Sequence, residues 1–300
     1  MRFDVARSTR EALEAGAPVV ALESAVLTHG LPRPLNREVY AEMVRAVEAQ
    51  GAVAAPVGVT AGVVRVGLAP DEWEALGTRP DVVKAGLSDL APVTARGGWA
   101  GTTVAATCWA AFRAGVRVFA TGGIGGVHRG WARRLDVSGD LAALARYPVC
   151  VVCSGAKVVL DLDATREALE TVGVTVVGYR TDRFPAFVCE DAGFPVPHRV
   201  EDPRAAAEVV AARDALGLSG AVLLVQPPPA DAAVDREELE AALAERVPGD
   251  TRGAEVTPAL LARLAEATRG KTLRANRALL VANARLAAGV ARCLVRGAEP

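Results

Sequence analysis

Lysine is scarce in this chain of 300 residues, and one lysine stands in an unusual place. Three of the 34 basic residues are lysines, at positions 84, 157 and 271, and the rest are arginines. Lys157 lies within an otherwise apolar run that begins at Val149, in the stretch CSGAKVVLDL. A desolvated amine can lose its proton and act as a nucleophile, which a guanidinium cannot do. The sequence therefore allows amine chemistry at Lys157, and a lysine stem that reaches to water is the alternative.

Further polar side chains follow other valine-rich runs. Glu23 comes directly after PVVAL and could serve as a general acid or base, or cap the next segment. Lys84 stands in DVVKAGLSDL, and His128 lies in the glycine-rich segment TGGIGGVHRG, residues 121–130. The glycine spacing matches neither GxGxxG nor GxxxxGK[ST], so an anion-binding backbone and a plain tight turn both remain open. Because α/β folds bind ligands at the carboxyl ends of strands, we expect these segments to meet.

The segment LDVSGDL holds two aspartates, Asp136 and Asp140, around Ser138. Carboxylates at this spacing can bind a hard divalent cation that retains several waters. They can equally cap the helix expected up to Arg146, and the spacing alone favours capping.

These segments are carried by alternating apolar and amphipathic runs, which predict an α/β fold with a largely parallel sheet. The expected strands are residues 18–22, 63–68, 116–121, 149–154, 174–179 and 221–226. Helices are expected after Asn36, Thr103, Asp163 and Asp202, and the C-terminal third is expected to be nearly all helical, with helices at 236–247, 257–270 and 272–295.

Composition narrows the classes of function. A net charge of −1 and a pI near 6.4 give no basic field for a nucleic acid polymer, so any nucleotide partner is expected to be small. No leader and no uncharged apolar run of membrane-spanning length is apparent, which predicts a cytoplasmic protein without a membrane partner. The five cysteines are expected to be core residues, because Cys150 and Cys153 point to opposite faces of a strand.

Several long strings together resemble the pseudouridine-5′-phosphate glycosidase family, also called indigoidine-synthase-A-like. They are ALESAVLTHGLPRPLN, GTTVAAT, FATGGIGGVHRG, DVSGDL, CSGAKVVLDL, YRTDRFPAF, GFPVPHRV, EVTPALLARL and ANRALLVANARLAA. The resemblance implies a single α/β/α domain over residues 1–300, a homotrimer, and one divalent ion such as Mn²⁺ per subunit. It also implies reversible cleavage of pseudouridine 5′-phosphate to uracil and ribose 5-phosphate.

The same resemblance implies roles for individual residues. Lys157 falls on the covalent nucleophile, Glu23 on the proton donor and Asp136 on the metal ligand. The implied substrate contacts are Lys84, Val104, His128, Ser138, Gly139 and Asp140.

Two departures from the family pattern concern substrate recognition. Around Lys84 the family usually reads KVSRRDL, whereas this chain reads KAGLSDL and lacks both arginines; the family's SAD is SGD here. Two other functions remain open: a Schiff-base aldolase acting on another phosphosugar, and a non-catalytic nucleotide-binding protein. A borohydride-trappable adduct would exclude the second of these.

Overall fold

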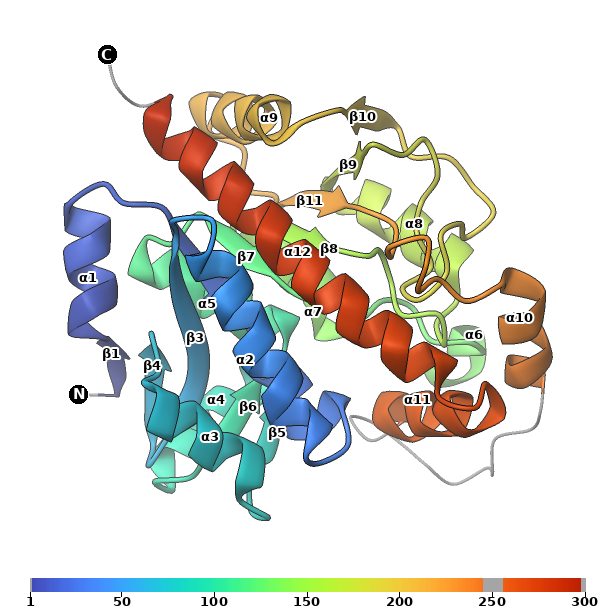
Figure 1. Ribbon diagram of the computed structural model, residues 1–300, viewed down its shortest axis with the longest axis horizontal. Helices are drawn as coiled ribbons and strands as arrows, with labels where there is room; N and C mark the ends of the chain where they lie inside the picture. The colour runs from blue at the N-terminus through green and yellow to red at the C-terminus, as the bar shows by residue number, and fades with distance from the viewer. Residues whose placement is uncertain (1, 245–255, 298–300) are drawn as a thin grey trace.

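The computed structural model describes residues 2–244 and 256–297, and Figure 1 shows helices packed on both faces of a central sheet. In the described residues the sheet has eleven strands, in the order β1-β4-β3-β2-β7-β8-β11-β9-β10, with β5 and β6 branching from β3. Neighbouring strands are parallel except where β3 pairs with β4 and β6. The strands are β1 Phe3–Val5, β2 Val19–Leu22, β3 Val53–Thr60, β4 Val63–Val66, β5 Val83–Ala85, β6 Ala100–Thr102, β7 Val118–Ala120, β8 Cys150–Cys153, β9 Thr175–Tyr179, β10 His198–Val200 and β11 Val222–Val225.

Helices cover both faces of this sheet. On one face α12 runs between α2 and α9 and crosses β2, β7 and β8; α5, α7 and α8 lie on the other (Figure 1). The helices are α1 Arg7–Glu14, η1 Val26–Gly30, α2 Leu35–Glu48, α3 Pro70–Thr78, α4 Leu87–Ala95, α5 Val104–Ala114, α6 Trp131–Arg134, α7 Gly139–Arg146, α8 Leu162–Thr171, α9 Pro203–Ala215, α10 Arg236–Ala244, α11 Val256–Ala267 and α12 Lys271–Arg296. The α/β fold with its largely parallel sheet and helical C-terminal third is therefore confirmed.

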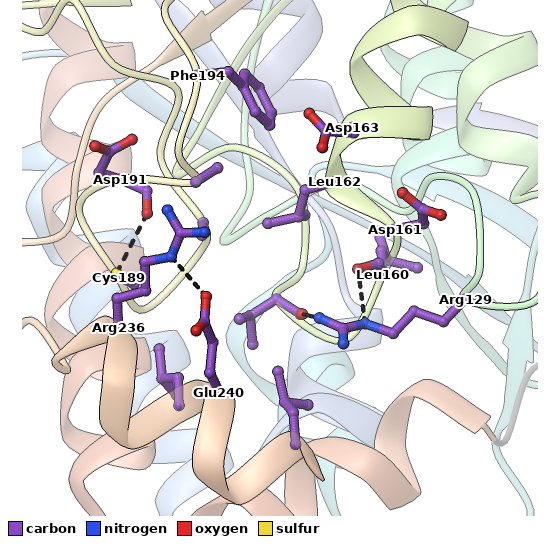
Figure 2. Close-up of a pocket in the computed structure, with 15 residues that line it drawn as sticks. Arg129, Leu160, Asp161, Leu162, Asp163, Cys189, Asp191, Phe194, Arg236 and Glu240 are labelled. Carbon is purple, nitrogen blue, oxygen red and sulfur yellow. Dashed lines mark hydrogen bonds and ion pairs between the residues drawn. The ribbon is translucent and has the colours of Figure 1, made fainter.

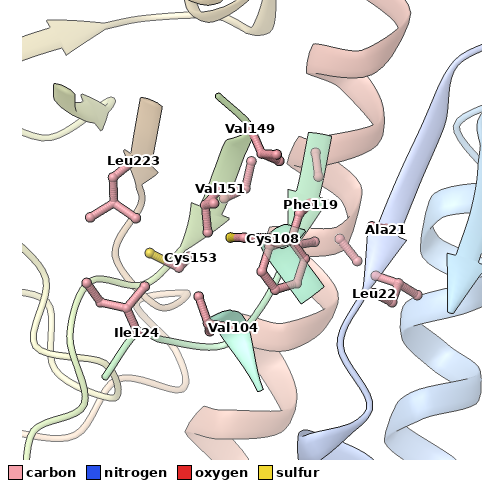
Figure 3. Close-up of a cluster of buried hydrophobic side chains, with 14 of the residues drawn as sticks. Ala21, Leu22, Val104, Cys108, Phe119, Ile124, Val149, Val151, Cys153 and Leu223 are labelled. Atoms are coloured by element: carbon pink, nitrogen blue, oxygen red, sulfur yellow. The ribbon is translucent and has the colours of Figure 1, made fainter. Parts of the chain in front are cut away.

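The core lies where the central strands meet these helices. Phe119 of β7, Val151 of β8 and Cys108 of α5 are all fully buried and lie close together in Figure 3. Continuous apolarity of β2, β7, β8 and β11 follows from this arrangement, because helices cover both faces of those strands. Four of the five cysteines are buried and unpaired, as expected, whereas Cys293 is half-buried.

Helix α12 is long and apolar enough to cross a membrane by length and composition alone. In this structure 56% of its most apolar stretch is buried inside the protein. Contacts with α2, α9 and the sheet therefore account for its apolar residues.

All six expected strands are present, and the structure adds others. β3 runs from Val53 to Thr60 through Pro56 and Gly58, residue types that argue against a strand in the sequence. The expected cap of the first long helix is wrong: α2 begins at Leu35, and the Asn36 side chain instead donates to the carbonyls of Leu27 and Gly77. The expected helix 236–247 is described as far as Ala244, and its last three residues lie outside the described part.

Candidate active site

The parallel register of the central strands brings four polar residues to one edge of the sheet. Leu22 of β2 is level with Ala120 of β7, and Ala120 is level with Val152 of β8. Val225 of β11 is level with Cys153. The residues that follow these strand ends are Glu23, Thr121, Ser154 and Gln226. Side chains separated by up to about 200 positions in the sequence are thus neighbours at the carboxyl edge, where α/β folds bind ligands.

Glu23, Lys84 and Lys157 line one pocket at this edge, with a volume of ≈ 60 Å³. Its other walls come from the segment after β2, from α11 and α12, and from the loop that carries Phe187; they are Ala25, Val26, His29, Gly30, Gly122, Gly123, Phe187, Pro258, Leu261, Asn276 and Leu280. The structure therefore brings together both residues expected to be catalytic and one expected substrate contact.

Backbone pairing fixes the position of Lys157. Its amide donates to the carbonyl of Ile124 at 3.1 Å, and the amide of Ile124 donates to Gly155 at 3.0 Å. Gly155 has φ +75°, and a Cβ there would come 2.0 Å from the carbonyl oxygen of Pro185, so only glycine fits. The glycine-rich segment and the GAK segment thus form one unit that holds the lysine at the pocket.

Glu23 is a buried carboxyl group, with 6% of its surface exposed. Burial raises its pKa above the ordinary value, and the nearby Lys157 ammonium acts in the opposite direction. The Thr121 hydroxyl donates a hydrogen bond to Oε1 of Glu23 and also lowers the pKa. A carboxyl group with a raised pKa beside an amine suits a general acid.

Two other ionisable groups of the pocket have lowered pKa values. Burial lowers the pKa of Lys84, and the Lys157 ammonium lowers it further by repulsion. Burial and the charge of Lys84 also lower the pKa of His29, whose Nδ1 lies 2.7 Å from the Thr28 hydroxyl. The pocket therefore disfavours additional positive charge. An anionic ligand would offset the repulsion between its positive groups.

Asp140 has a structural role in this arrangement. Its Oδ1 accepts from the amide of Ala105 at 2.9 Å, and its Oδ2 accepts from the amide of Gly125 at 2.8 Å. The carboxylate thereby ties the start of α5 to the glycine cluster. The amide of Gly125 is therefore bonded to a carboxylate of the protein itself, and binding of a ligand anion by the glycine-rich segment stays a prediction.

The remaining expected substrate contacts lie around the start of α7 and α5. Ser138 caps α7, where its Oγ accepts from the amide of Asp140, and Gly139 begins that helix with open space beside its Cα. Val104 begins α5 and is buried in the core beside Ile124 (Figure 3). None of these three residues lines the pocket of Glu23 and Lys157 among the described residues.

Asp136 and His128 lie together on the loop between β7 and α7. The amide of His128 donates to the carbonyl of Asp136 at 3.0 Å, and Nδ1 of His128 lies 3.9 Å from Oδ2 of Asp136. The Asp136 side chain is 37% exposed. Among the described residues there is no group of three or more histidine, cysteine or acidic side chains placed to hold a metal ion.

His29, Phe187 and Asn276 are polar or aromatic pocket residues to which the sequence analysis gives no role. Asn276 of α12 is 7% exposed, and its Oδ1 has no hydrogen-bond partner in the described structure. His29 lies in the same segment as Glu23, within the string THG. That proximity in the sequence is the signal by which His29 could have been found. Phe187 and Asn276 come from distant segments. Both lie in strings that resemble the family, YRTDRFPAF and ANRALLVANARLAA, but nothing in those strings singles them out as pocket residues.

A larger cavity, of ≈ 330 Å³, lies beside the residues that follow Lys157. Figure 2 shows Arg129, Asp163, Asp191 and Glu240 around it, with Arg129 held by the carbonyls of Leu160 and Val158. Arg236 is paired with Glu240. Neither Glu23 nor Lys157 lines this cavity, so it is separate from the candidate active site.

A largely parallel α/β sheet with a lysine and a buried acid in one pocket at its carboxyl edge has the arrangement of an enzyme active site. The chain matches the family described as indigoidine synthase A like protein over residues 8–293. The chain belongs to this family.

Two relatives from bacteria carry the name pseudouridine-5′-phosphate glycosidase. The protein from Methylobacterium nodulans is 50% identical over 99% of this chain and 89% of its own length. The protein from Symbiobacterium thermophilum is 48% identical over 96% of each chain.

Two solved structures share the fold. An indigoidine synthase A (IdgA)-like protein from Thermotoga maritima superimposes with a TM-score of 0.91 at 36% identity, covering 98% of this chain and 97% of that one. The prealnumycin C-glycosynthase AlnA, in complex with ribulose 5-phosphate, gives a TM-score of 0.90 at 38% identity with the same coverage.

Proposed function

We propose that this protein reversibly cleaves the C–C glycosidic bond of pseudouridine 5′-phosphate to uracil and ribose 5-phosphate. The observation that carries the proposal is the meeting of Glu23 and Lys157 in one pocket, from segments more than 130 residues apart. The names of the relatives, at 48–50% identity, support this substrate.

A C–C glycosidic bond has no heteroatom leaving group, so the two-carboxylate scheme for O-glycosides does not apply directly. A lysine resolves this difficulty. The neutral amine of Lys157 attacks C1′, a C1′–N bond forms, and the C1′–O4′ bond breaks to open the ribose ring. The proton lost by the amine balances the new hydroxyl at O4′.

Glu23 then acts as the general acid. The C5–C6 double bond of uracil takes up the Glu23 proton at C5. The C1′–C5 bond then breaks, and the electron pair of that bond restores the C5–C6 double bond. The lone pair of the Lys157 nitrogen forms an iminium with C1′ at the same time. Water hydrolyses the iminium and releases ribose 5-phosphate and the free lysine. The proton released when the iminium is hydrolysed to the neutral Lys157 amine returns to the Glu23 carboxylate, which closes the cycle.

Asn276 is suited to contact the base. Its Oδ1 is buried and without a partner, and a ring N–H of uracil would supply the missing donor. Leu280 and Phe187 beside it give an apolar wall for the flat ring.

Lys84 in the pocket and donor groups of the loop before α7 are suited to the 5′-phosphate. Lys84 lines the pocket, and the start of α7 at Gly139 presents a helix N-terminus. His128 precedes this helix on the same loop. The missing arginines of the KAGLSDL segment leave Lys84 as the principal cation in our proposal.

Asp136 is suited to a divalent ion such as Mn²⁺ only if the ion keeps most of its waters, because a single exposed carboxylate is available. Such an ion would supply positive charge near the phosphate. Asp136→Ala should abolish the dependence of turnover on Mn²⁺ while leaving the melting temperature within a few degrees of wild type. Activity of the wild-type protein that survives exhaustive chelation would contradict this role.

We also propose that the whole chain forms one domain, that it assembles as a homotrimer, and that it works in the cytoplasm. The resemblance to the family supports the assembly state, and the single sheet running through the described residues supports the domain. Sedimentation of the purified protein tests the trimer directly.

The test of the function is loss of the pseudouridine 5′-phosphate chromophore on incubation with the protein and Mn²⁺, with uracil and ribose 5-phosphate identified as products. A Schiff-base aldolase would leave this substrate intact and cleave another phosphosugar. The likeness to AlnA makes C-glycoside synthesis on another aromatic acceptor a second candidate. That activity would appear as coupling of the acceptor to a pentose phosphate without cleavage of pseudouridine 5′-phosphate.

A further inference from the structure

Thr121 is the hydrogen-bond partner of the proposed proton donor. It follows β7 directly, is 0% exposed, and its hydroxyl donates to Oε1 of Glu23. Gly122 and Gly123, which follow it, line the pocket. Thr121 itself does not line the pocket. It therefore contacts Glu23 from the buried core and not from the pocket where a substrate would bind.

Asn283 of α12 holds the strand end that carries Thr121. Its Nδ2 donates to the carbonyl of Thr121 at 2.8 Å, and its Oδ1 accepts from Nε2 of Gln226 at 2.7 Å. The same side chain lies 3.2 Å from the hydroxyl of Ser154. One fully buried amide thereby joins the ends of β7, β8 and β11.

We propose that Thr121 is a positioning residue for Glu23, held in place by Asn283. This inference rests on the proposed role of Glu23 as the proton donor. Because the hydroxyl donates to Oε1, the proton of the neutral acid resides on Oε2. That proton passes to C5 of uracil, and the carboxylate left behind keeps the hydrogen bond from Thr121 on Oε1.

A hydrogen bond to an ionised acceptor is stronger than one to a neutral acceptor. The bond from Thr121 therefore strengthens as the proton leaves Glu23, and it lowers the barrier of the acid step. Because this bond strengthens in the acid step and not on substrate binding, its loss should lower kcat and leave KM nearly unchanged.

Several charged or titratable groups face Glu23 from the surrounding elements. Lys157 and Lys84 favour its ionised form, and Asp140 disfavours it. Tyr40 of α2 and Cys108 of α5 also interact with it, and burial raises the pKa of both, so they remain neutral near pH 7. Loss of the Thr121 hydrogen bond would raise the pKa of Glu23 further.

The experiment compares Thr121→Val, which has nearly the same shape without the hydroxyl, with Thr121→Ser, which keeps it. We expect Thr121→Val to lower kcat roughly 10- to 100-fold, with KM changed by no more than about twofold. Because Glu23 must be protonated to act, the fall of kcat at high pH should move to higher pH in this variant. Thr121→Ser should restore both kcat and the pH profile. Thr9→Val changes another buried threonine, on α1, and should leave both unchanged.

A Thr121→Val protein with wild-type kcat and pH profile would overturn the proposal, as would failure of Thr121→Ser to restore them. If Thr121→Val does not fold, Thr121→Ala makes the same comparison in a smaller side chain. Glu23→Gln separates this inference from the proposed function. A loss of turnover in Glu23→Gln but not in Thr121→Val refutes only the role of Thr121, whereas full turnover in Glu23→Gln refutes the proton donor itself.

Discussion

Lys84 and Lys157 share one pocket, but their expected tasks differ. Burial and repulsion by Lys157 lower the pKa of Lys84, so a bound phosphate would stabilise the charged form of Lys84. Lys157 instead has to react as the neutral amine. The two lysines of one pocket are thus proposed for different tasks, Lys84 for binding the phosphate and Lys157 for the covalent step.

The phosphate contact leads to a prediction about substrate choice. Pseudouridine should have a kcat/KM at least about 10-fold below that of its 5′-phosphate, because a charge-assisted contact contributes about 1.5–3 kcal/mol. Lys84→Gln should lower kcat/KM for the phosphorylated substrate and so reduce the difference in kcat/KM between the two substrates. Steady-state kinetics with both substrates measure this, and equal turnover by the wild-type protein would remove Lys84 from the phosphate site.

At the scale of elements, α12 contributes Asn276 to the pocket and Asn283 to the strand ends, seven positions apart on one helix. Asn283→Leu should lower the melting temperature by several degrees, because each buried partner left unpaired costs about 1–3 kcal/mol. Asn276→Leu is the matched control on the same helix. It removes an oxygen that has no partner in the described structure and should shift the melting temperature less. Equal shifts in a thermal melt would show that Asn283 does not fasten the strands.

The sequence predicts those elements whose residue types match their burial in the fold. It does not predict elements whose residues are explained only by contacts with distant segments. The valine-rich strands β2, β7, β8 and β11 were predicted because burial on both faces demands apolar residues. β3 is not predicted because it contains Pro56, and a proline inside a segment normally argues against a strand there. Asn36 looked like a helix cap, but its amide satisfies two carbonyls from other segments.

The candidate site shows the same division. Glu23 stands out because it directly follows an apolar run, and Lys157 because it is a lone cation within one. Thr121 is one of many threonines by sequence, and its contact with Glu23 arises only when β2 and β7 pair in register. Asn283 depends on the packing of α12 across the same strands. Contacts of this kind follow from the tertiary fold and leave no local pattern.

At the scale of the whole molecule, the buried acid should affect stability as well as activity. The pKa of Glu23 is raised in the folded protein, so the folded state binds this proton more tightly than the unfolded chain does. Its contribution to the free energy of unfolding therefore decreases as the pH rises from 4.5 through the folded pKa.

Glu23→Gln cannot ionise and should lose this dependence. Its melting temperature should fall less than that of the wild type as the pH is raised from about 4.5 into the alkaline range. Calorimetry at a series of pH values measures the difference. Parallel curves for the two proteins would mean that Glu23 has an ordinary pKa, which would weaken its assignment as the acid.

The measurement that tests the account most directly is borohydride reduction in the presence of ribose 5-phosphate, followed by peptide mapping by mass spectrometry. An imine between the sugar C1′ and Lys157 would be fixed as one sugar phosphate per chain, on the peptide that contains Lys157. Lys157→Arg keeps the charge but supplies no free amine, and it should abolish both the adduct and turnover. Glu23→Gln should still form the adduct, because its proton is needed at uracil C5. A label on Lys84 or Lys271, or no label from an active enzyme, would contradict the assignment of Lys157 as the nucleophile.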